Sequence, residues 1–284
     1  MKDIINKAET LVEALPYIRE FYNQSVVIKY GGSAMEDEKL KEMVLTDIAI
    51  MKYVGIKPVI IHGGGKHITH LANRLGKEST FVDGYRVTDD EMMEITEMVL
   101  AGRLNKSIVS HLNLHGVKAV GISGRDAGCI TARSKGEKYG FVGEIEKVDA
   151  KLIRDLEEND YVPVISPIAS DQNGQALNVN ADIAASEIAR AIKAKKLVLL
   201  TDVNGIYKDI NDKNSLYSSL TVSQSKKLID EGIIVSGMLP KIRACIDAIQ
   251  DGVGKIHIIN GKISHSLLLE IFTKEGVGTQ ITSD

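Results

Sequence analysis

Two stretches of the chain place glycine directly after an apolar run, SVVIKYGGS at 25–33 and KPVIIHGGG at 57–65. Glycine weakens a strand or helix by roughly 0.5–1 kcal/mol relative to alanine, so three consecutive glycines need a physical reason. Three reasons are compatible with the pattern: a tight turn without further role, an oxyanion hole, or a cradle of backbone amides for a phosphate group. Lys29, two residues before Gly31, would add a full positive charge to such a cradle.

The sequence disfavours the oxyanion hole. A hydrolase with a histidine–triple-glycine loop also needs a G-x-S-x-G turn that exposes its serine nucleophile. GISGR is the nearest match and has Ser123 at the serine position, but Arg125 occupies the site of the last glycine. A Walker loop and a G-x-G-x-x-G motif are also absent from the sequence. Tight turns and a phosphate cradle remain as hypotheses.

Three polar side chains crowd the start of an expected helix in LNVNAD, namely Asn178, Asn180 and Asp182. Side chains of this type usually cap a helix by accepting hydrogen bonds from its first free amides. A single cap does not need three such residues. The segment is therefore a candidate for ligand binding as well as for capping.

Two further segments put candidate ligand groups beside glycine. An apolar run ends in Thr201 and Asp202 and turns at Gly205, and SGMLPKI places Gly237 and Lys241 at the start of another helix. The helix dipole disfavours a cation at that end. Lys241 is therefore either solvated or placed to meet an anion, and the sequence leaves both open.

The elements that would position these residues alternate between strands and helices. Apolar runs, most of them continuous, predict strands at 25–30, 58–62, 118–123, 162–166, 196–202 and 255–260. Helical spacing predicts helices at 37–54, 88–115, 149–159, 181–194, 221–231 and 239–250. Capping boxes are expected at Thr88 with Glu91 and at Thr221 with Gln224, and an exposed β-hairpin is expected at 132–147. This alternation favours an open three-layer α/β/α sandwich around a mostly parallel sheet, with ligands beyond the carboxyl ends of the strands.

Composition limits the possible classes of function. The 284 residues are 44% hydrophobic, which is enough for a large core. A net charge of −3 and a pI of about 6.2 indicate no binding of nucleic acid or of an anionic membrane surface. No apolar run approaches the ~18 residues of a membrane span, and charges interrupt the N-terminal segment, so no signal peptide is predicted. The two cysteines, Cys129 and Cys245, are expected to be buried and reduced, in a cytoplasmic protein.

Six segments, in this order, resemble motifs of the amino-acid kinase family: VIKYGGSA, IIHGGGKHI, GYRVT, LNVNAD, LLTDVNGIY and SGMLPKI. The resemblance covers essentially the whole chain. Within the family it is specific to the branch that phosphorylates the γ-carboxylate of N-acetyl-L-glutamate, the second step of arginine biosynthesis by the acetylated route. It implies the open sandwich fold, ATP as phosphoryl donor and Mg²⁺ brought with ATP. The kinase domain would be 25–284, with an acceptor lobe at about 25–170 and a nucleotide lobe at about 171–284.

The resemblance also implies roles for individual residues. Catalysis would depend on Lys29, Lys241 and Asp182. The acceptor would be bound by Gly64, Gly65, Arg86 and Asn178, and ATP by Gly31, Gly32, Thr201, Asp202, Gly237 and Lys241. An ionised acceptor carboxylate needs positioning and charge neutralisation rather than a protein nucleophile or base, so His62 is expected to be a packed residue. Neither a protein ligand set for a metal nor a catalytic role for Arg125 is expected.

Residues 1–24 precede the first expected strand and carry apolar side chains at helical spacing, with Pro16 inside the pattern as a source of a kink. A helix packed on its own subunit is one explanation. Resemblance to arginine-sensitive members implies another: interlaced helices link dimers into a hexamer, a trimer of dimers, that arginine inhibits. The arginine site would then include His265, Glu270, Gly276 and Gly278.

Two alternatives remain open. One is another kinase of the same fold, acting on aspartate, glutamate, carbamate or UMP. The triple glycine together with GYRVT and NVNAD argues against these acceptors, and no residues remain for the regulatory domain usual in aspartate kinases. The other is a non-catalytic ligand sensor. The presence of both Lys29 and Lys241 favours a catalyst.

Overall fold

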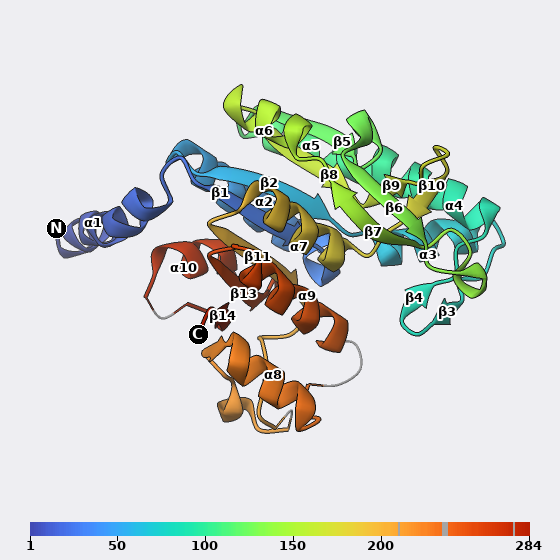
Figure 1. Ribbon diagram of the computed structural model, residues 1–284. Helices are drawn as coiled ribbons and strands as arrows, with labels where there is room; N and C mark the ends of the chain where they lie inside the picture. Colours follow the sequence, from blue (N-terminus) through green and yellow to red (C-terminus); the bar gives the residue numbers. More distant parts are fainter. Residues whose placement is uncertain (210, 235–237, 275) are drawn as a thin grey trace.

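The central sheet of the protein has eight strands in the order β12–β14–β13–β11–β1–β2–β8–β5 (Figure 1). The computed structural model describes residues 1–209, 211–234, 238–274 and 276–284. The strands are β1 Ser25–Tyr30, β2 Lys57–His62, β5 Ala119–Ser123, β8 Val162–Ser166, β11 Lys196–Thr201, β12 Ser219–Thr221, β13 Lys255–Asn260 and β14 Gly278–Thr282. Only the pair of β13 and β14 is antiparallel among these strands of the described chain. This mostly parallel sheet confirms the predicted fold class.

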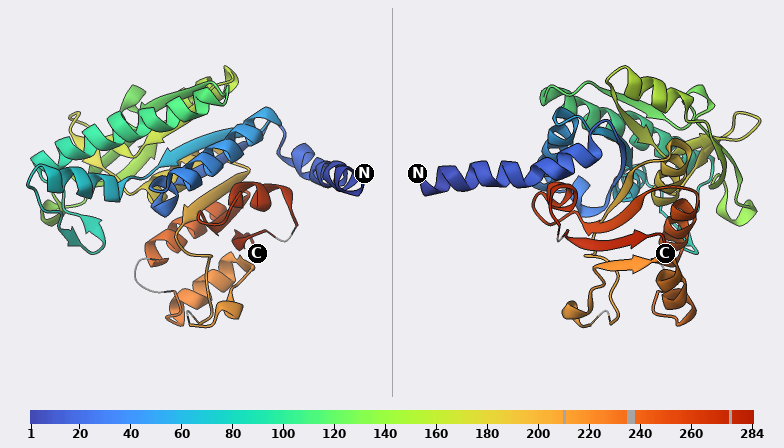
Figure 2. Two further views of the ribbon diagram at one scale, coloured as in Figure 1. Left: turned by 180° about the vertical axis from the view of Figure 1, so that it is seen from behind. Right: turned by 60° about the vertical axis from the view of Figure 1, so that its left-hand side comes forward.

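Helices cover both faces of the sheet, as the two views of Figure 2 also show. The α-helices of the described residues are α1 Lys2–Phe21, α2 Glu38–Tyr53, α3 Gly65–Arg74, α4 Asp90–Glu97, α5 Asn105–Leu114, α6 Lys151–Glu158, α7 Ala181–Ile192, α8 Val222–Asp230, α9 Leu239–Gln250 and α10 Ser266–Phe272. Short 3₁₀ turns are η1 Gly32–Met35, η3 Asp126–Gly128, η4 Glu137–Tyr139 and η5 Lys213–Ser215, and η2 Met98–Leu104 is π-helical.

Two hydrophobic clusters lie on opposite faces of the sheet. Val26 and Ile28 of β1 belong to the first, with α2, α4 and α5, whereas Val27 belongs to the second, with α7 and α9. Because successive strand side chains alternate between the faces, a strand buried on both faces is mostly apolar along its whole length. Cys129 and Cys245 are free and buried as predicted, and burial raises the pKa of these thiols to about 11 and about 12.

In the described chain, two smaller sheets accompany the central sheet. One is a four-stranded sheet with the order β10–β9–β6–β7, and the other is a hairpin formed by β3 and β4. Their bounds are β3 Phe81–Val82, β4 Tyr85–Arg86, β6 Ile130–Ser134, β7 Gly143–Val148, β9 Ile168–Ser170 and β10 Ala176–Asn178. Strands β6 and β7 pair in antiparallel fashion, which confirms the predicted hairpin. The predicted capping box of α8, Thr221 with Gln224, is also present.

The helix predicted at 88–115 is divided, and its predicted capping box is wrong. It consists of α4, the π-helical η2 and α5, and Asp89 rather than Thr88 caps α4. Thr88 pairs in a β-bridge with Gly140, so the helix cannot begin before this bridge ends. Glu91 forms an ion pair with a lysine on the surface instead of closing a box.

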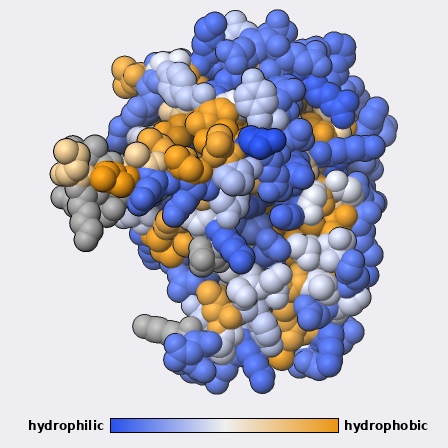
Figure 3. Space-filling view, turned by 90° about the vertical axis from the view of Figure 1, so that its left-hand side faces the viewer, coloured by the Kyte–Doolittle hydropathy of each residue, from blue (hydrophilic) through white to orange (hydrophobic). Residues whose placement is uncertain are grey.

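Helix α1 projects from the body of the molecule (Figures 1 and 2) and runs through Pro16. The side chains of Leu11, Val12 and Leu15 are 73%, 69% and 52% exposed, and Figure 3 shows apolar side chains gathered along this helix. At its other end Phe21 is buried. A kink at Pro16 stays a prediction. None of the helices in the described part of the chain is long and apolar enough to cross a membrane.

Candidate active site

The two glycine turns lie next to each other, as their positions after neighbouring strands predict. Strands β1 and β2 are parallel neighbours, and Tyr30 pairs with His62 at their carboxyl ends. The amide of Gly63 donates a hydrogen bond to the carbonyl of Tyr30 (2.8 Å), which joins the turns directly. Gly64 precedes the first residue of α3, whose first amides have no partner within the helix. The edge therefore combines backbone donors with the positive end of a helix dipole.

Lys29 and Lys241 meet at one carboxylate. The Nζ atom of Lys29 lies 3.1 Å from Asp182 Oδ1, and that of Lys241 lies 3.5 Å from Asp182 Oδ2. The three side chains come from β1, α9 and α7, and each is less than one-fifth exposed. Burial by itself raises the pKa of Asp182, but the charges of the two lysines outweigh it and hold that pKa below its usual value. Asp182 is thus an anion that holds two cations.

The crowded start of α7 divides its tasks among its three polar residues. The side chain of Asn180 caps the helix by accepting hydrogen bonds from the amides of Asp182 (2.8 Å) and Ile183 (3.3 Å). Asp182 is free to pair with the lysines. Asn178, at the end of β10, lines a cavity. This distribution explains why one helix start carries more polar side chains than a cap requires.

A cavity of about 200 Å³ opens beside this cluster. Its lining includes the four residues that the family resemblance assigned to the acceptor, Gly64, Gly65, Arg86 and Asn178. They come from the start of α3, from β4 and from β10, three segments far apart in the chain. The fold therefore brings all four together around a space large enough for a small metabolite.

Arg86 is almost fully buried, with 8% of its surface exposed. Its Nη2 atom donates to the carbonyl of Gly65 (2.7 Å) and to Thr69 Oγ1 (2.9 Å), and its Nη1 atom donates to Ser79 Oγ. The guanidinium group thus holds the glycine turn against the β3–β4 hairpin. Among the described residues, three of its five N–H groups are used in this way, and two remain for a ligand.

The first glycine turn lies against an acidic side chain. Asp202 Oδ1 accepts a hydrogen bond from the amide of Ser33 (2.8 Å). Gly32 has a φ of +69°, and a Cβ atom there would lie 2.9 Å from Asp202 Oδ1. A Cβ atom on Gly31 would lie 2.8 Å from Lys29 Nζ. Gly32 is therefore required by its backbone conformation, whereas a Cβ atom on Gly31 would displace the end of the Lys29 side chain.

Of the remaining residues assigned to ATP, the structure describes Thr201 and Lys241 but not Gly237. Thr201 ends β11 next to β1, and its hydroxyl donates to the carbonyl of Val203 (2.9 Å). Lys241 lies in the cluster around Asp182. Gly237 lies outside the described residues. Within the described ranges, no group of three or more His, Cys, Asp or Glu side chains is placed to hold a metal ion.

His62 is a packed residue, as predicted. It is fully buried, and burial lowers its pKa to about 4. Its Nδ1 atom lies 3.0 Å from the carbonyl of Gly63 and its Nε2 atom lies 3.3 Å from Asn105 Nδ2. These partners fit a neutral ring that donates from Nδ1 and accepts at Nε2. The buried His62 ring therefore stabilises the triple-glycine turn through its hydrogen bond to the Gly63 carbonyl.

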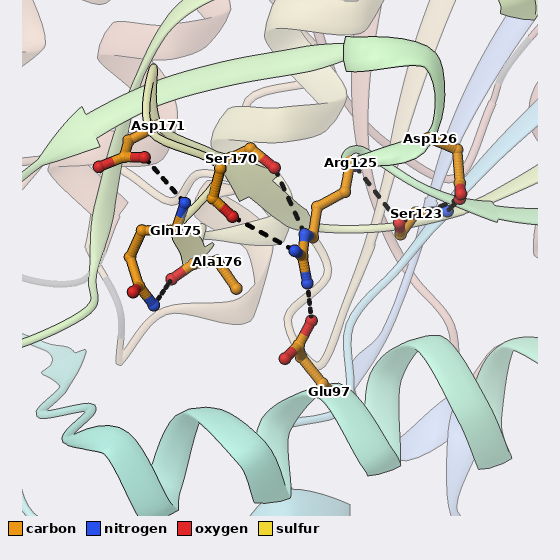
Figure 4. Close-up of polar contacts among 9 residues, drawn as sticks. Glu97, Ser123, Arg125, Asp126, Ser170, Asp171, Gln175 and Ala176 are labelled. Carbon is orange, nitrogen blue, oxygen red and sulfur yellow. Dashed lines mark hydrogen bonds and ion pairs between the residues drawn. The ribbon is translucent and has the colours of Figure 1, made fainter.

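Arg125 joins three parts of the structure outside the acceptor cavity (Figure 4). Its guanidinium group pairs with Glu97 of α4 and donates to Ser170 Oγ of β9 (3.3 Å). The hydroxyl of Ser123, the nucleophile position of the disfavoured hydrolase hypothesis, donates to Asp126 Oδ2 (3.0 Å). These contacts hold the turn between β5 and β6 against α4 and β9.

The model of the amino acid kinase family matches residues 24–260. The chain belongs to the amino acid kinase family. Acetylglutamate kinases of Methanococcus vannielii and Syntrophomonas wolfei are each 51% identical to this kinase; the first alignment covers 99% of this chain and 100% of the relative, the second 99% and 98%.

Solved structures agree with this assignment. An N-acetylglutamate synthase from Neisseria gonorrhoeae, complexed with coenzyme A and N-acetyl-glutamate, superposes with a TM-score of 0.86 at 27% identity. The match covers 98% of this kinase but 63% of the synthase chain. The same synthase with L-arginine gives a TM-score of 0.80 at 26% identity, covering 98% of this chain and 65% of that chain. A carbamate kinase from Giardia, at 18% identity and a TM-score of 0.68, covering 92% and 99%, shares the fold.

A second cavity of about 360 Å³ lies where α1 meets α10 and β14. Glu270, Gly276 and Gly278, three of the four residues assigned to an arginine site, contribute to its lining. The fourth, His265, does not join them: its Nδ1 atom lies 2.6 Å from Asp47 Oδ1 on α2. His265 is the residue before α10, so its side chain leaves the helix on the side of α2.

Glu270 is buried at the floor of this second cavity. It pairs with Lys196 Nζ (3.0 Å) and with the ring of His257. Burial alone raises its pKa, but these two partners outweigh burial and hold the pKa at about 2. Within the described part of the chain, His257 Nε2 has no hydrogen-bond partner. A buried polar atom in a cavity lining is a candidate contact for a ligand.

The sequence patterns do not indicate Lys196 and His257 as site residues. Both lie on strands that the sequence predicts as apolar runs, β11 and β13. A signal was present, because His257 interrupts the otherwise apolar run IHII in the interior of a central strand. A polar residue at such a position has to find a partner or a ligand.

Proposed function

We propose that this kinase transfers the γ-phosphoryl group of ATP to the γ-carboxylate of N-acetyl-L-glutamate, in the biosynthesis of arginine. The observation that carries the proposal is the buried cluster of Lys29, Asp182 and Lys241. It lies beside a small-molecule cavity and next to a glycine turn of phosphate-binding type. The names of the relatives at about half identity support the choice of acceptor.

The chemistry requires little of the protein beyond placement and charge. An oxygen of the acceptor carboxylate attacks the γ-phosphorus, a new O–P bond forms, and the bond to the β-phosphate oxygen of the leaving ADP breaks. No proton moves, because the carboxylate is already ionised at neutral pH. Lys29 and Lys241 neutralise charge on the transferring group, and Asp182 keeps both ammonium groups in place. Mg²⁺, bound by phosphate oxygens, would neutralise further charge on ATP.

Acceptor and nucleotide would bind on opposite sides of the lysine pair. The two free N–H groups of Arg86 would meet the α-carboxylate of the acceptor, while Asn178 and the amides of Gly64 and Gly65 contact the rest of it. ATP would lie along Gly31, Gly32, Thr201, Asp202, Gly237 and Lys241. In this proposal about 25–170 form the acceptor lobe and about 171–284 the nucleotide lobe.

We also propose that arginine inhibits this kinase from the second cavity and that α1 assembles a hexamer of three dimers. The cavity is lined by Tyr17, Glu20 and Phe21 of α1 as well as by Glu270, so a ligand there would contact the helix. The lining carries charges of both signs, Glu20 and Glu270 together with Lys196, Lys255 and Lys274, which suits an amino acid with a cationic and an anionic end. The exposed apolar stripe of α1 suits burial against another copy of the helix. A related synthase structure contains L-arginine.

A panel of acceptors tests the proposed reaction. ATP consumption is measured with N-acetylglutamate, glutamate, aspartate and carbamate, and the Lys29→Ala variant serves as the blank for contaminating ATPases. We expect N-acetylglutamate to give the highest kcat/KM by a wide margin. A higher kcat/KM for any of the other three acceptors would refute the assignment.

The Arg86→Lys variant is expected to raise the KM for N-acetylglutamate far more than the KM for ATP. Lysine keeps the charge but lacks the planar fork, and its single nitrogen would replace the two spaced nitrogens that bond to Gly65, Thr69 and Ser79. Steady-state kinetics with each substrate varied in turn measure the two constants. An effect confined to the KM for ATP would show that Arg86 does not bind the acceptor.

The Gly64→Ala and Gly65→Ala variants are expected to fail in different ways. A Cβ atom on Gly64 would lie 2.5 Å from Leu104 and 2.6 Å from Leu100, so this change overpacks the core and lowers stability by ~1–3 kcal/mol. On Gly65 the nearest atom is 3.8 Å away, on Arg86, so the protein keeps its Tm. The added methyl group at the cavity wall raises the acceptor KM instead. Calorimetry and steady-state kinetics on both variants check this contrast. The same Tm for Gly64→Ala and Gly65→Ala would contradict it.

A further inference from the structure

We propose that Thr88 is a positioning residue that orients the side-chain amide of Asn178 within the acceptor cavity. Thr88 is fully buried and lies behind the lining of that cavity. Its hydroxyl contacts both Asn178 and Arg86, which come from strands about ninety positions apart in the chain. The inference rests on the proposed function, because it assigns Arg86 and Asn178 to the binding of the acceptor.

The hydroxyl forms a chain of two hydrogen bonds with a fixed direction. Thr88 Oγ1 donates its single proton to the carbonyl of Arg86 (2.8 Å). It can then only accept from Asn178, whose Nδ2 atom lies 3.2 Å away. The amide of Asn178 must therefore turn its nitrogen toward Thr88. Its carbonyl oxygen and one N–H group remain for the acceptor.

The backbone around Thr88 is held independently of this hydroxyl. The amide of Phe141 donates to the carbonyl of Thr88 (2.6 Å), and the amide of Asn178 donates to the carbonyl of Phe141 (2.8 Å). Gly140, with a φ of +66°, leaves the space for this contact, since a Cβ atom there would lie 2.2 Å from the Thr88 carbonyl oxygen. Strand pairing thus sets where Asn178 lies. The hydroxyl sets which way its amide faces.

Loss of the hydroxyl should act on acceptor binding rather than on the fold. Valine has nearly the shape of threonine but no polar atom, so Thr88→Val frees the Asn178 amide to rotate and exchange its oxygen and nitrogen. It also leaves the Arg86 carbonyl without its hydroxyl donor. We expect the KM for N-acetylglutamate to rise by roughly three- to tenfold, with the KM for ATP unchanged.

The matched control is Thr96→Val. Thr96 is equally buried, and its hydroxyl donates to the carbonyl of Met92 within α4 (2.7 Å). The same chemical change there should lower the Tm without altering the acceptor KM. Thr88→Ser keeps the hydroxyl and should restore the wild-type acceptor KM, whether or not Thr88→Val folds well enough for assay.

A double-mutant cycle with Asn178→Ala separates orientation from simple packing. If Thr88 acts through Asn178, then Thr88→Val has little further effect on the acceptor KM once the amide is removed. Additive effects, a raised acceptor KM in Thr88→Ser, or an unchanged acceptor KM in Thr88→Val would each overturn the proposal. A wild-type protein that does not phosphorylate N-acetylglutamate would instead refute the proposed function, and this inference with it.

Discussion

The Lys29→Ala and Lys241→Ala variants are expected to fold and to lose a factor of ~10²–10³ in kcat, the largest effect expected of any single substitution in this kinase. Each ammonium group lies within 3.5 Å of Asp182, and the two residues before Asp182, Asn180 and Ala181, line the acceptor cavity. Its charge matters most when negative charge spreads over the transferring phosphoryl oxygens. The KM values for both substrates should change much less than kcat.

Lys52→Ala is the matched control for the lysine variants. Lys52 has the same side-chain exposure of 13% as Lys29 and Lys241, and it also pairs with an aspartate, Asp160. It lies on α2, outside the cluster around Asp182. We expect kcat of this variant to stay within about twofold of the wild type. Steady-state kinetics and thermal unfolding are measured on all three, and a normal kcat in either active-site variant would remove that lysine from the mechanism.

Deletion of residues 1–22 is expected to give an active dimer that no longer responds to arginine. The deletion removes the exposed stripe at Leu11 and Leu15 together with the part of α1 that lines the second cavity. The acceptor cavity and the lysine pair lie on other elements, so kcat without arginine should be close to normal. Light scattering measures the assembly, and activity across a range of arginine concentrations measures the response.

A point variant separates assembly from ligand binding in this test. Leu11→Ser combined with Leu15→Ser alters the exposed stripe but leaves in place Tyr17, Glu20 and Phe21 at the cavity. We expect it to lose the hexamer while arginine still binds, as titration calorimetry would record. An intact protein that is a dimer and keeps full activity in millimolar arginine would contradict the regulatory proposal and leave the kinase proposal unaffected.

The sequence by itself determined the layered architecture of this protein, because a buried strand or helix face requires apolar residues at regular positions in the local sequence. The continuous apolar runs matched central strands such as β1, β2 and β11, since a strand covered on both faces has no polar side. Two glycine turns after two such strands indicated a shared edge. The roles at that edge came from the ordered motifs of the family rather than from local patterns.

Only the tertiary structure decided which side chains meet. Lys29 reaches Asp182 because α7 packs directly on β1, a feature of tertiary packing that no local pattern records. The sequence predicts Thr88 as a helix cap, but Thr88 is buried beside Asn178. Its β-bridge to Gly140 keeps it outside the helix, which is capped by Asp89. A hydrogen bond between distant residues depends on the path of the whole chain. Sequence spacing alone therefore cannot specify it.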